Sequence, residues 1–91
     1  MLFRSEVESL DQVEEAIVAG ADMLLLDNMD VPTLRRAVQM VQGRAKTEAS
    51  GRVTLENIRE IAQTGVDFIS VGRITQSAAA VDIGLDWITQ E

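Results

Sequence analysis

Short apolar runs alternate with capped helical patterns along this chain, and this alternation restricts the fold more than any other feature. Segments of strand length cover residues 2–8, 22–28, 44–49 and 67–73. Segments with the apolar spacing of helices cover residues 10–19, 31–42, 55–64 and 76–82. Because short connections join each strand to a helix and then to the next strand, the pattern predicts right-handed crossovers and a parallel sheet.

The helical segments carry their own start and stop signals. The N-cap residues are Ser9, which forms a capping box with Gln12, then Asp30 and Thr54. Glycine follows the last turn of these helices at Gly20, Gly43 and Gly65. The apolar face expected for the third helix consists of Leu55, Ile58, Ile61 and Ala62.

An offset of 45 residues aligns "SLDQVEEAIVAGADMLLLD" with "TLENIREIAQTGVDFISVG", residues 9–27 with residues 54–72. Such a repeat is the size of a quarter of an eight-stranded βα barrel, although any two strand–helix units share caps and apolar spacing. Either origin predicts an α/β fold of four consecutive βα units, a partial (half) TIM-type barrel. Four strands leave two open edges, so the alternatives are an open flavodoxin-like sheet or closure by homodimerisation.

Composition excludes several classes of function. The 91 residues have a formal charge of −7, which disfavours binding to nucleic acid. Without cysteine or histidine the chain lacks disulfides, thiol nucleophiles and zinc sites based on these residues. Its apolar runs are too short for a membrane span, and its start resembles no signal peptide, so we expect a cytoplasmic protein.

The carboxyl ends of the predicted strands carry the residues most suited to chemistry, because parallel βα folds place their sites there. Glu6 and Asp27 supply carboxylates, whereas Ser50, Gly51 and Gly72 are small enough for backbone N–H groups to approach an anion. Carboxylates beside a phosphate site predict a bridging Mg²⁺ ion.

Several motifs in order, "LLDN", "EASG", "TGVD" and "SVG", resemble the carboxyl-terminal portion of quinolinate phosphoribosyltransferase over residues 4–87. The resemblance implies synthesis of nicotinate mononucleotide from quinolinate and phosphoribosyl pyrophosphate with Mg²⁺, in NAD biosynthesis. By position, Glu6 and Asp27 resemble the catalytic acids that meet the ribose hydroxyls and the metal. The residues that resemble phosphate or substrate contacts are Ser50, Gly51, Gly72 and Gln76.

The chain departs from the family pattern at several positions. Arg52 stands where a second glycine follows "EASG", and Gln76 stands where histidine is frequent. Arg4 and Ser5 replace glutamate and valine, and Ala79 replaces proline. Two hypotheses follow. The chain is either the phosphate and magnesium part of a transferase site, inactive without a homo-oligomeric partner or the rest of a barrel, or an excised or engineered half-barrel scaffold without activity.

Overall fold

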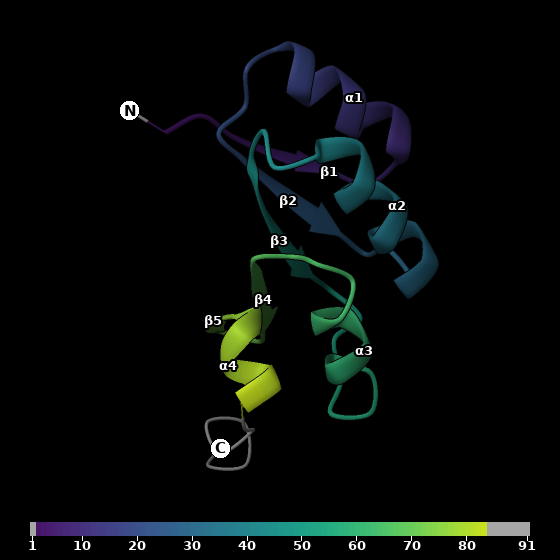
Figure 1. Ribbon diagram of the computed structural model, residues 1–91, viewed down its shortest axis with the longest axis vertical. Helices are drawn as coiled ribbons and strands as arrows, with labels where there is room; N and C mark the ends of the chain where they lie inside the picture. The colour runs from purple at the N-terminus through teal and green to yellow at the C-terminus, as the bar shows by residue number, and fades with distance from the viewer. Residues whose placement is uncertain (1, 84–91) are drawn as a thin grey trace.

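The computed structural model describes residues 2–83 and shows strands that alternate with helices (Figure 1). The strands are β1 (Arg4–Val7), β2 (Met23–Asp27), β3 (Lys46–Ser50), β4 (Phe68–Val71) and β5 (Ile74–Ser77). The helices are α1 (Leu10–Val18), α2 (Val31–Val41), α3 (Ile58–Ala62) and α4 (Ala78–Ile83). None of the helices within residues 2–83 is long and apolar enough to pass through a bilayer.

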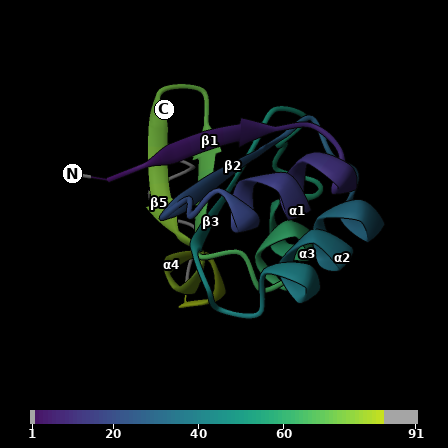
Figure 2. The same ribbon diagram turned by 90° about the horizontal axis from the view of Figure 1, so that it is seen from above.

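The strands form one sheet in the order β1-β2-β3-β4-β5. The first four are parallel, and β5 runs antiparallel to β4. Because consecutive parallel strands are neighbours, right-handed crossovers place their helices on one face, and Figure 2 shows α1, α2 and α3 on the same side. This is the partial barrel predicted above, whereas a flavodoxin-like sheet reverses its strand order and carries helices on both faces. Closure by homodimerisation stays a prediction.

Alternation along the strands gives the sheet two distinct faces. On the helix-covered face, Leu24, Leu26 and Ile69 are fully buried against apolar side chains of the helices. The opposite face, called here the open face, includes Arg4, Glu6, Met23, Leu25, Asp27, Glu48, Ser50, Phe68 and Ser70. Carboxylates and hydroxyls on the open face therefore lie outside the apolar core.

The first two helices begin where their caps predict. The Ser9 hydroxyl accepts the N–H of Gln12 at 3.3 Å, and the Asp30 carboxylate accepts the N–H of Thr33 at 2.9 Å. Each cap satisfies an N–H group that has no partner inside the helix. Helix α2 ends at Val41, and its C-cap residue Gln42, with a left-handed φ of 51°, precedes the expected glycine.

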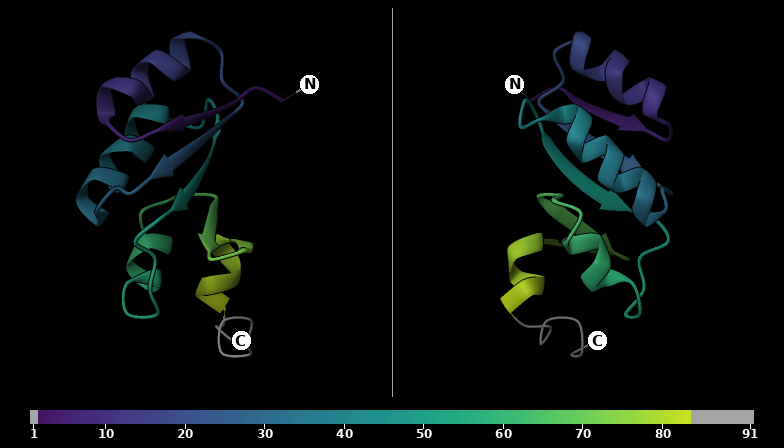
Figure 3. Two further views of the ribbon diagram at one scale, coloured as in Figure 1. Left: turned by 180° about the vertical axis from the view of Figure 1, so that it is seen from behind. Right: turned by 45° about the vertical axis from the view of Figure 1, so that its right-hand side comes forward.

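The carboxyl-terminal part of the described chain corrects the predictions. Residues 74–77 form β5, so the helix predicted over residues 76–82 begins only at Ala78 and packs beside α3 (Figure 3). Helix α3 begins at Ile58 instead of residue 55, because residues 55–57 form a turn held by side-chain hydrogen bonds. Leu55, expected in the buried stripe, is consequently 66% exposed.

Candidate functional site

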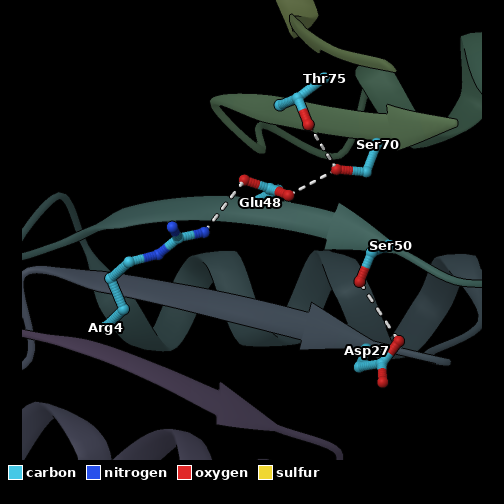
Figure 4. A network of polar contacts seen from close by, with 6 residues as sticks. All are labelled: Arg4, Asp27, Glu48, Ser50, Ser70 and Thr75. Carbon is cyan, nitrogen blue, oxygen red and sulfur yellow. Dashed lines mark hydrogen bonds and ion pairs between the residues drawn. The ribbon is translucent and has the colours of Figure 1, made fainter. Parts of the chain in front are cut away.

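The strongest candidate site lies at the carboxyl ends of β2 and β3, on the open face. The pairing of these strands sets Asp27 beside Ser50, and the Ser50 hydroxyl donates to Asp27 Oδ1 at 3.2 Å (Figure 4). Both side chains are half-buried, so this bond is partly shielded from water. The structure thus brings together one predicted acid and one predicted phosphate contact.

Gly51 lies against the Asp27 carboxylate at a position where a side chain would not fit. A Cβ atom there would lie 2.9 Å from Asp27 Oδ1 and would also collide with Asn28 Oδ1. The φ of Gly51 is +72°, a region that L-residues rarely adopt. The glycine therefore permits the close approach of the β3 backbone to the Asp27 carboxylate.

Glu6, the second predicted acid, lies on the open face and is exposed. It pairs in register with Leu25, so Asp27 is its diagonal neighbour on the next strand. Within residues 2–83, no group of three carboxylates gathers as a metal site. Two carboxylates on one face fit Mg²⁺, which uses one or two acids and takes further oxygen ligands from phosphates and water.

The other two predicted residues are placed differently. Gly72, with a φ of +62°, opens the two-residue turn between β4 and β5 at the same sheet edge as Ser50. Gln76 pairs with Ile69 in β5, and paired residues share a face, so its side chain lies on the helix-covered side. The structure does not bring Gln76 to Ser50, because residues 74–77 form a strand and not the first turn of a helix.

Sequence reasoning missed a polar network centred on Glu48. This carboxylate is 8% exposed, accepts the Ser70 hydroxyl at 2.5 Å and lies 4.0 Å from the Arg4 guanidinium (Figure 4). The hydroxyl oxygens of Ser70 and Thr75 lie 2.9 Å apart and share a hydrogen bond. A hollow of about 310 Å³ adjoins the network, lined by Leu2, Arg4, Met23, Glu48, Phe68 and Thr75. The sequence did indicate that Glu48 lies on the open face, since Glu48 and Ser50 are two residues apart on one strand and must share a face.

The segment between β3 and α3, residues 51–57, is called here the β3–α3 loop. Gly51 and Arg52 are consecutive left-handed residues, with φ angles of +72° and +60°. Within residues 2–83, the N–H groups of residues 51, 52 and 53 donate to no protein acceptor. Backbone N–H groups without a protein acceptor are suited to an anion. Helix α3 starts at Ile58, too far along the chain to add its dipole there.

Electrostatics connect this loop to the start of α2. Hydrogen bonding by Thr33, first through its side chain and then through its N–H, lowers the pKa of Asp30. The positive charge of Arg52 lowers this pKa further. Arg52 therefore acts on the residue that caps α2, beside the carboxyl edge of the sheet.

Comparison with known proteins supports the family resemblance of the sequence motifs, independently of the site geometry. Residues 3–86 match the model of the family described as "Quinolinate phosphoribosyl transferase, C-terminal domain". Over 89% of its length the chain is 42% identical to a probable nicotinate-nucleotide pyrophosphorylase [carboxylating] of Bacillus subtilis. Over the same share it is 48% identical to quinolinate phosphoribosyltransferase [decarboxylating] 2a, mitochondrial, of Nicotiana tabacum.

A solved structure shares the fold as well. The crystal structure of nicotinate-nucleotide pyrophosphorylase from Ehrlichia chaffeensis superposes with a TM-score of 0.74 at 43% identity, over 81% of this chain. The chain spans 28% of the Bacillus protein, 26% of the tobacco protein and 28% of the Ehrlichia chain. The similarity therefore covers nearly all of this chain and little more than a quarter of each relative.

Proposed function

This chain belongs to the family of quinolinate phosphoribosyl transferase C-terminal domains, and we propose that it carries the phosphate-binding part of a phosphoribosyl transfer site. In this proposal its ligand is the phosphate of a phosphoribosyl group, as in phosphoribosyl pyrophosphate. The whole reaction, which would convert quinolinate to nicotinate mononucleotide in NAD biosynthesis, would need groups beyond those that the carboxyl edge of this sheet supplies.

One observation carries the proposal: Asp27, Ser50 and Gly51 meet at the carboxyl edge of β2 and β3, where only glycine fits at position 51. Free backbone N–H groups donate to phosphate oxygens, and the Ser50 hydroxyl would do so when its single proton turns from Asp27 to the ligand, while a carboxylate accepts from ribose hydroxyls. Gly72 lies at the same edge and would extend this surface towards β4. The arrangement suits a sugar phosphate better than a phosphate alone, because it offers both donors and an acceptor.

The same residues fit a magnesium ion. Asp27 Oδ1 receives the Ser50 hydroxyl, which leaves Oδ2 for a metal, and Glu6 on the neighbouring strand would supply the second carboxylate. When bound, Mg²⁺ would offset the negative charge of pyrophosphate as it leaves. The backbone N–H groups of the β3–α3 loop would meanwhile hold the phosphoribosyl group in place.

We expect the 91-residue chain alone to bind such ligands weakly and to form no nicotinate mononucleotide. Arg4 is the base nearest the open-face hollow, and it already lies beside Glu48. Further bases for the carboxylates of quinolinate would have to come from a second copy of the chain or from the rest of a barrel. We propose accordingly that the functional form is an oligomer or a longer polypeptide, in the cytoplasm.

Titration calorimetry with ribose 5-phosphate and with phosphoribosyl pyrophosphate plus Mg²⁺ tests the proposal. We expect Ser50→Ala and Asp27→Ala to weaken binding at least about tenfold, since each removes a polar contact to the ligand. Ser70→Ala is the matched control, because Ser70 is also an open-face serine but contacts Glu48 and Thr75. Absence of binding by the folded wild-type chain would reject the proposed function and would favour the scaffold hypothesis.

A further inference from the structure

Two pairs of residues at equivalent positions of the repeat, Ser9 with Gln12 and Thr54 with Asn57, differ in two side-chain contacts. In the first copy, Gln12 donates its N–H to the Ser9 hydroxyl, and its side-chain oxygen accepts the N–H of Glu8 at 2.6 Å. In the second copy, Asn57 donates its N–H to the Thr54 hydroxyl at 3.2 Å, and its side-chain oxygen accepts the N–H of Thr54 at 2.8 Å. The first pair caps α1, whereas the second closes the turn of residues 55–57 that precedes α3, so Thr54 is not the N-cap that the sequence predicted.

Asn57 makes an additional hydrogen bond that Gln12 does not make within the described chain. Its side-chain nitrogen donates to the backbone carbonyl of Arg52 at 2.7 Å. One amide group thus bridges residues 52 and 54 of the β3–α3 loop, with both of its polar atoms in use. The bridge begins at a left-handed residue, where an unrestrained L-residue would favour another conformation.

This bridge determines where one loop N–H group points, that of Val53. In a planar trans peptide the carbonyl and the following N–H face opposite ways. When Asn57 holds the Arg52 carbonyl, the N–H of Val53 points away from Asn57. The same contact holds Arg52 at a φ of +60°, next to Gly51. An amide that contacts no ligand would therefore set the direction of a donor that does, and would hold the loop that carries the other two.

We propose that Asn57 is a positioning residue for phosphate: its side chain holds the β3–α3 loop so that the N–H groups of residues 51–53 face the ligand. This inference rests on the proposed function, because it needs phosphate to bind at that loop. Gln12 provides the internal reference, since it stands at the equivalent position without the contact to a carbonyl of the loop.

The test is a titration of the full chain with ribose 5-phosphate, followed through the backbone amide NMR signals of residues 51–53. We expect Asn57→Ala to bind about tenfold more weakly than wild type, whereas Gln12→Ala binds like wild type. Both variants should melt at lower temperature, since each loses a side-chain hydrogen bond to the backbone before its helix. Wild-type affinity in Asn57→Ala would overturn the inference alone, whereas a wild-type chain that does not bind ribose 5-phosphate would overturn the proposed function and the inference with it.

A second variant keeps the test valid if Asn57→Ala does not fold. Asn57→Asp retains the oxygen that accepts the Thr54 N–H but loses the donor to Arg52. Its control is Leu55→Asp, which adds the same charge in the same turn at a side chain that is 66% exposed. We expect Asn57→Asp to bind at least about fivefold more weakly than Leu55→Asp, and equal affinities would overturn the proposal.

Discussion

The two copies of the repeat, residues 9–27 and 54–72, share their turns but differ in how much regular structure they form. Gly20 and Gly65 both adopt positive φ, at +86° and +99°. Asp22 and Asp67 both tie the start of their strand to the preceding one, through the N–H groups of Phe3 and Thr47. Equivalent residues of the two copies therefore make equivalent contacts at the start of each strand.

The helices of the two copies differ because one side-chain amide is shorter than the other. Helix α1 has nine residues and α3 has five. Asn57 bonds back to the loop before it, and short polar side chains that do this compete with helical hydrogen bonds. Gln12, at the equivalent position, lies within α1, and its side chain accepts the N–H of Glu8, two residues before the helix. The comparison shows that a repeat can keep its pair of polar side chains and lose a helical turn.

The strands of the two copies differ in their neighbours. Strand β2 pairs through four residues with β1 and through five with β3. Strand β4 pairs through only two residues with β3, and its other neighbour is the antiparallel β5. The second copy is thus joined to the sheet by a narrower ladder, which leads to the following predictions.

The largest expected effect comes from truncating the equivalent core residues Leu24 and Ile69, both 0% exposed. We expect each alanine variant to lower the free energy of unfolding by about 3 kcal/mol, since each leaves a cavity. Hydrogen exchange should separate them: Leu24→Ala accelerates exchange throughout the sheet, whereas Ile69→Ala accelerates it mainly in β4 and β5. Val18→Ala, at an 82% exposed position, is the control. Equal acceleration of all strands in both variants would contradict the narrower ladder.

The next effect concerns the two aspartates. Asp67→Ala removes an acceptor at 2.9 Å from the N–H of Thr47, a residue that is only 2% exposed, so we expect a loss of about 2 kcal/mol. Asp22→Ala should cost about 0.5 kcal/mol, because water can replace its exposed bond to Phe3. Urea unfolding of both variants measures the difference. A larger loss for Asp22→Ala would show that exposure does not decide their contributions.

A smaller effect, of opposite sign, is expected at the β3–α3 loop. Arg52→Gly should raise the free energy of unfolding by about 1 kcal/mol, because arginine at a φ of +60° is strained and glycine is not. Gln42→Gly, at a φ of +51°, is the matched control and should gain a similar amount. Thermal unfolding gives both values, and ribose 5-phosphate titration shows whether Arg52 also contacts phosphate. If Arg52→Gly lost both stability and affinity, the arginine would be the better residue there.

The smallest effect is a dependence on pH at the helix between the copies. The pKa of Asp30 is lowered in the fold, so its contribution is present above the unfolded value of about 3.9 and is lost as pH falls through the folded value. Ser9, which caps α1, does not titrate. We expect Asp30→Asn to lose less stability than wild type between about pH 5 and about pH 2. Identical acid sensitivity would mean that other carboxylates cause it.

Much of the site could be predicted because it depends on local order. Alternation along β3 and the ends of parallel strands were enough to bring Asp27, Ser50 and Gly51 together. Gln76 was misplaced because its position depends on whether residues 74–77 pair with β4 or begin a helix. A glycine that opens a two-residue hairpin turn, Gly72 followed by Arg73, was the local signal for β5. The polar network of Glu48 was not predicted, because its partners Arg4 and Ser70 come from β1 and β4, which are distant in the sequence.

By itself the sequence determined the alternation of strands and helices, their caps and the parallel sheet, because apolar spacing and capping act between residues a few positions apart. Only the tertiary structure decided that α3 is short and that Leu55 is exposed, since the bond from Asn57 to the Arg52 carbonyl forms only when the loop after β3 takes its left-handed conformation. The tertiary structure also decided how closely Gly51 approaches Asp27, because that distance depends on the register of two strands and on a backbone conformation that glycine permits but does not require.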